Sequence, residues 1–88
     1  MNNLISLYIN KLSLNDVFNF ASKNNINLNN EEAIFILDFI KKNWQEVLAN
    51  PDSLKIDQYK SRFSEENFNK IKKLIIFYRN KYAKYLIE

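Results

Sequence analysis

The chain has 88 residues, of which 47% are apolar, 15% aromatic and 26% charged, and its formal net charge is +3. This length favours a single domain over residues 1–88, and the richness in aromatic residues argues against a disordered chain. Cys, His and Gly are all absent. Their absence excludes disulfide frameworks, thiolate and imidazole catalysis, the usual zinc sites, and the Gly-rich phosphate loops of nucleotide-binding proteins.

The first residues lack the basic segment and the long apolar stretch of a signal peptide. No apolar run, that from Ala33 to Leu37 included, approaches the roughly 20 residues that span a bilayer. The missing Cys fits a reducing compartment, so we expect a cytoplasmic protein that does not bind membranes.

The first predicted helix covers about residues 4–11. A second helix begins at Ser13, where Ser13 and Asp16 have the spacing of a capping box. We expect it to end near Asn24 and Asn25, because Asn adopts the left-handed conformation more readily than most residues. The extended connector that follows should point Ile26 and Leu28 into the core and its Asn side chains into water.

The third predicted helix begins at Asn29 or Asn30, with two Glu residues in its first turn, and runs to about Ala49. Pro51 fits the first position of a short fourth helix over about 51–62. Ser64 begins a fifth helix that runs nearly to the end of the chain.

These elements predict an all-α fold, a compact orthogonal bundle of four to five helices with a helix-extended-loop-helix unit at about 14–48. Connectors are short, so neighbours in sequence should pack together. The apolar stripe of the third helix includes Trp44, and we expect its replacement by Ala to cost about 3–5 kcal/mol.

Carboxylates are the remaining candidates for catalysis, and glycosidase-type chemistry needs two of them facing each other across a cleft. Several lie in first turns of predicted helices, where capping and the helix dipole explain them. We therefore expect no enzyme activity, no cofactor, no metal and no small-molecule substrate. The carboxylates considered are Asp16, Glu31, Glu32, Asp38, Glu46 and Asp57.

Aromatic residues outside the main stripes suggest a partner surface. Phe35 and Phe39 lie beside the stripe of the third helix, and Tyr78, Tyr82 and Tyr85 recur at i, i+4 and i+7 in the last helix. If these rings are uncovered, they form a patch of the kind found at protein interfaces. The alternative is that they edge the core. The leading prediction is a non-enzymatic protein–protein interaction module, with a homodimer as one form of it.

Basic residues suggest a second function. Residues 51–88 carry a net charge of +4, against −1 for residues 1–50. On the last helix, one quadrant gathers four Lys residues around an aromatic ring, which suits phosphates and a stacked base; these residues are Lys70, Lys73, Phe77, Lys81 and Lys84. A nucleic-acid-binding accessory module is thus the alternative function. The competing interpretation is that this Lys face of the last helix is simply exposed to solvent.

Residues 14–42 carry a recognisable pattern, a short helix, the connector Asn25-Ile26-Asn27-Leu28 and a longer helix. It resembles the YqfT-like family, small all-helical proteins of unknown function from low-G+C Gram-positive bacteria. The resemblance implies a bacterial, cytoplasmic, all-helical protein and no site residues. The segment is more loosely similar to SAP and LEM modules, some of which bind DNA, but Asn24-Asn25 stands where those modules commonly have Gly.

Overall fold

The computed structural model describes the backbone of residues 2–87 and the side chains of residues 4–50, 52–77 and 80. The described chain is helical with no strand, which confirms the all-α prediction. Its elements are α1 (Asn2–Lys11), α2 (Leu14–Lys23), α3 (Asn30–Ala49), the 3₁₀ segments η1 (Pro51–Ser53) and η2 (Ile56–Arg62), and α4 (Glu65–Ile87).

The predicted capping box at the start of α2 is present. The Ser13 backbone N–H donates to Asp16 Oδ2 at 2.9 Å, and the Asp16 N–H donates to Ser13 Oγ at 3.2 Å. These bonds satisfy two backbone donors that the helix itself leaves without partners.

The end of α2 is a Schellman motif with Asn in the place that Gly usually takes. Asn25 has φ 61°, the left-handed conformation that the sequence predicts there. The Ile26 N–H then reaches Ala21 O at 2.9 Å, and the Asn25 N–H reaches Ser22 O at 3.1 Å. This turn reverses the chain and directs Ile26 back onto α2.

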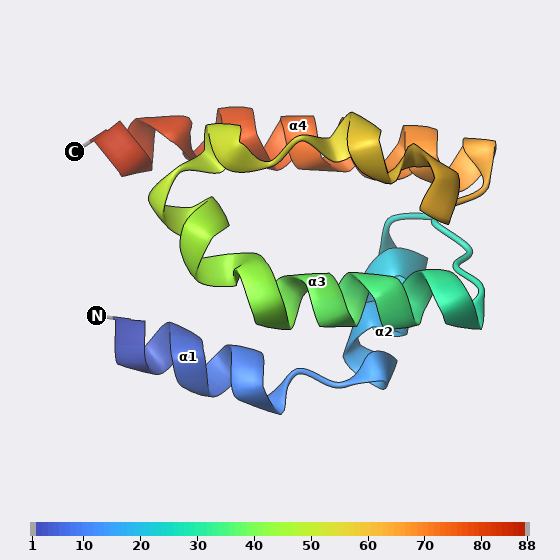
Figure 1. Ribbon diagram of the computed structural model, residues 1–88, viewed down its shortest axis with the longest axis horizontal. Helices are drawn as coiled ribbons and strands as arrows, with labels where there is room; N and C mark the ends of the chain where they lie inside the picture. Colours follow the sequence, from blue (N-terminus) through green and yellow to red (C-terminus); the bar gives the residue numbers. More distant parts are fainter. Residues whose placement is uncertain (1, 88) are drawn as a thin grey trace.

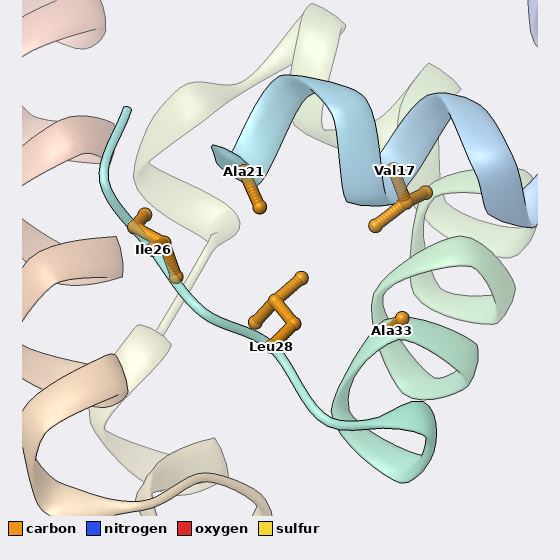
Figure 2. Packing of buried hydrophobic residues seen from close by; sticks show 5 residues of the cluster. All are labelled: Val17, Ala21, Ile26, Leu28 and Ala33. Atoms are coloured by element: carbon orange, nitrogen blue, oxygen red, sulfur yellow. The ribbon is translucent and has the colours of Figure 1, made fainter. Parts of the chain in front are cut away.

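The fully buried core is small and lies between α2, the connector and the start of α3. Figure 2 shows Leu28 pointing into the space between Val17 and Ala21 of α2 and Ala33 of α3. Ile26 and Leu28 are both buried, as the alternating pattern predicts. Larger side chains pack against this cluster but stay partly exposed; they are Leu14, Phe18, Ile36, Leu37, Ile71 and Leu74.

Figure 1 shows how the helices surround this core. α1 runs beside α3 in the opposite direction, and α2 crosses α3 at a steep angle. η2 and α4 lie on the other side of α3, with α4 running in the same direction as α3.

The predicted helix over about 51–62 is present as two 3₁₀ stretches with a break at residues 54–55. A 3₁₀ helix has three residues per turn, so residues i and i+3 align. This geometry puts Ile56, Tyr59 and Arg62 in one row of η2.

A buried carboxylate joins the N-terminal ends of α3 and α4. The Glu32 side chain is 2% exposed. Its Oε1 accepts from the Asn29 N–H at 2.9 Å, and the Glu32 N–H donates to Asn29 Oδ1 at 2.8 Å, which makes a capping box for α3. Its Oε2 accepts from the Ser64 N–H at 2.8 Å.

Asn67 completes this network. Its Nδ2 donates to Glu32 Oε1 at 2.8 Å and to Asn27 O, in the connector, at 2.9 Å. Its own N–H donates to Ser64 Oγ at 3.1 Å, so Ser64 caps α4 as predicted. One carboxylate thus holds the connector and two helix ends together, and both helix dipoles favour a negative charge at this place.

We expect Asn25→Ala to lower the free energy of unfolding by about 1 kcal/mol, because Ala pays a steric penalty at positive φ. Urea denaturation measures the change. Asn25→Gly is the control and should cause no loss. Equal losses for both variants would contradict the role given to this backbone conformation.

We expect Glu32→Ala to lower the free energy of unfolding by at least about 3 kcal/mol, because it leaves N–H groups at two helix ends without an acceptor. Glu31→Ala is the matched control, since Glu31 is the exposed neighbour in the same turn. Its loss should stay below about 1 kcal/mol. Similar losses for the two variants in urea denaturation would refute the network's importance.

Candidate functional site

The most prominent surface feature is a cavity of about 550 Å³ between the helices, which we call the apolar groove. Every element but η1 contributes to it, and the connector between η1 and η2 does as well. The lining residues are Tyr8, Ile9, Leu12, Asp16, Val17, Phe20, Ala21, Ile26, Leu28, Phe35, Ile36, Phe39, Ile40, Asn43, Trp44, Val47, Leu54, Ile56, Tyr59, Phe63, Ile71, Leu74 and Ile75.

The groove is open to solvent, and its lining is almost entirely apolar. Tyr8 and Phe20 line it although both are exposed. Among the described lining residues, Asp16 is the one with a charge, and that carboxylate already caps α2. Asn43 also has a local partner, because its Nδ2 donates to Phe39 O at 3.0 Å. The groove therefore offers apolar contact area and few free polar groups.

Trp44 lies on the wall of this groove and is half-buried. The sequence predicts it as part of the apolar stripe of the third helix, but the buried core lies at the other end of α3, around Ala33. An Ala replacement of a half-buried side chain should cost less than the 3–5 kcal/mol expected from full burial. As the sole Trp of the chain, Trp44 is also a built-in reporter of groove occupancy.

The two Phe residues predicted as a partner surface pack within the molecule. The Phe35 ring lies 5.5 Å from the Tyr59 ring and 5.7 Å from the Phe63 ring, and the Phe39 ring lies 5.1 Å from Tyr59. The Arg62 guanidinium lies 4.7 Å from the centre of Phe35. η2 and Phe63 thus cover part of both Phe rings, which stay half-buried and also line the groove. No local pattern in the sequence indicates this cover.

The two most exposed large apolar side chains of the described residues, Leu4 and Tyr8, lie on α1. Leu4, Leu7 and Tyr8 are 78%, 57% and 68% exposed, and they share one side of the helix. We call these three residues the outer face of α1. Ile9, about half a turn round the helix from Leu7, and Leu12, just after the helix, line the groove. Apolar residues on two sides of a short helix predict two packing partners, a signal that the sequence contained.

The predicted basic face is only partly described. Lys70 is engaged, because its Nζ donates to Asn25 O at 2.9 Å and pairs with Glu66 at 3.2 Å. Lys73 and Phe77 are exposed and lie one turn apart on α4. The remaining predicted side chains lie outside the described residues, namely Lys81 and Lys84 of the basic face and Tyr78, Tyr82 and Tyr85 of the partner surface.

The candidate carboxylates have different surroundings. Asp16 and Glu32 are caps, and Asp57 pairs with Lys72 at 2.8 Å. Glu31, Asp38 and Glu46 are exposed. Across the described residues, no group of three acidic side chains is arranged to hold a metal ion.

No helix in the described part of the chain has both the length and the apolar character to cross a membrane. Comparisons with protein-family models, curated proteins and solved structures gave no match. The resemblance to the YqfT-like family therefore stays a prediction, and function has to be argued from the groove itself.

Proposed function

We propose that this chain is a non-enzymatic protein–protein interaction module that works as a homodimer. The observation that carries the proposal is the apolar groove, which a single copy leaves open. Apolar surface of this extent favours association, because burying it removes it from water. A bacterial origin and a cytoplasmic location remain predictions from the sequence.

The exposed area supports a dimer in particular. The chain exposes 6865 Å². A folded monomer of 10.6 kDa exposes about 5,500 Å² on average, so the excess is about 1,400 Å². Obligate dimers bury roughly 1,000–2,500 Å² on each partner. The excess is thus of the size that one stable interface would cover.

We expect sedimentation equilibrium to show a dimer, and we expect ammonium sulfate to strengthen it, because excluded salts favour apolar burial. The emission of Trp44 should shift to shorter wavelength as protein concentration rises, since the partner removes water from the groove. A monomer at every concentration, with constant Trp44 emission, would overturn the proposed dimer.

Matched variants locate the interface. Val47→Ser changes a half-buried groove residue and should weaken the dimer roughly tenfold, or about 1.4 kcal/mol. Ile34→Ser changes an exposed residue of α3 that does not line the groove, and it should leave the dimer unchanged. Equal effects of the two variants on the dimer would place the interface outside the groove.

A nucleic-acid-binding accessory module is the second candidate. The observation in its favour is the exposed pair Lys73 and Phe77, a cation and an aromatic ring one turn apart on α4. The engagement of Lys70 with Asn25 and Glu66 weakens this candidate, because that ammonium already has two partners.

A mobility-shift assay at low salt tests this candidate with single- and double-stranded probes. If the chain binds nucleic acid, the retardation should fall steeply as the salt concentration rises. This is the opposite of the salt response expected of the apolar dimer. Lys73→Glu should abolish the shift, whereas Lys23→Glu, an exposed control on α2, should reduce it little. No retardation of either probe would reject the candidate.

A further inference from the structure

We infer that helix α1 of one copy docks with its outer face on the apolar groove of a second copy. In this exchange, the second copy does the same in return, about a two-fold axis. The inference rests on the proposed homodimer and names the segment that fills the groove. The segment that binds is thus a short, almost uncharged helix with apolar residues on two sides.

α1 has the composition that such an occupant needs. Between residues 2 and 11 its only charge is that of Lys11, at its C-terminal end. The outer face of α1 presents two Leu side chains and one Tyr, spaced at i, i+3 and i+4. This is the spacing by which an amphipathic helix anchors in a groove. With Leu4 78% exposed, this face has little cover from its own chain.

The groove suits a helix better than an acyl chain. Among the described residues, no Lys or Arg lines it, so this part of the groove has no cation to hold a fatty-acid carboxylate or a lipid phosphate. An apolar helix face needs no such anchor. Asp16, the one charged residue of the described lining, is opposite in sign to Lys11 of α1, so the exchange places no like charges of these residues against each other.

Tyr8 makes the arrangement self-complementary. It belongs to the outer face of α1 and also lines the groove, so the two surfaces adjoin. In a two-fold dimer, the same patch serves both copies. When α1 of one copy covers the mouth of the other groove, its own groove is covered in return. Both surfaces are then buried, as the excess exposed area requires.

Charge placed on the outer face tests the exchange. We expect Leu7→Glu to weaken the dimer roughly 100-fold, because a carboxylate would have to enter an almost entirely apolar groove in which Asp16 is already negative. Leu7 is exposed in the single copy, so the helical circular dichroism and the unfolding midpoint at concentrations where the wild type is monomeric should not change. Ile34→Glu is the control and should remain dimeric.

Cross-linking gives an independent test, because the chain contains no Cys. One tagged copy carries Leu7→Cys, and a differently tagged copy carries Ile40→Cys in the groove. Oxidation of the mixture should link the two copies. The pair of Ile34→Cys with Ile40→Cys should give little cross-linked product.

The outcomes separate the two proposals. A wild-type monomer would overturn the dimer and the exchange together. A wild-type dimer that resists Leu7→Glu and gives no disulfide between residues 7 and 40 would overturn the exchange alone. A dimer that Leu7→Glu dissociates, with the disulfide formed between copies, supports both.

Discussion

The fold depends on the carboxylate of Glu32, which is buried where three parts of the chain meet. A buried carboxylate is stable when N–H groups surround it, and here the donors come from residue 29, residue 64 and the side chain of Asn67. The residues on this network are more than 30 positions apart in sequence. The placement of α4 against α3 therefore depends on a polar contact as much as on apolar packing.

This arrangement explains why the core is small. The network and the buried cluster lie together at the start of α3, and the large side chains farther along α3, such as Ile40 and Trp44, line the open groove. η2 covers part of α3 with Tyr59 and Phe63. The remaining apolar surface is what the proposed second copy would cover.

Local patterns in the sequence predicted the fold well, because caps and helical periods depend on residues a few positions apart. The capping box at Ser13, the left-handed Asn25 and the start of α4 at Ser64 are of this kind. Local patterns could not predict contacts between residues that are distant in sequence. These are the contacts of Phe35 and Phe39 with η2, and the hydrogen bonds of Glu32 at the ends of two helices. For the candidate site, the sequence indicated Phe35 and Phe39, and the structure places both half-buried in the wall of the groove. The most exposed apolar side chain of the described residues, Leu4, lies on α1 and was not predicted as part of a site.

The position of the Glu32 network also has a mechanical consequence. It fixes one end of α3, and Trp44 and Val47 lie toward the other end of this 20-residue helix. A helix of that length is about 30 Å long, so a tilt of about 5° at the fixed end would displace the far end by about 2.6 Å. The groove residues near the far end of α3 are therefore those that a given tilt of the helix would move most.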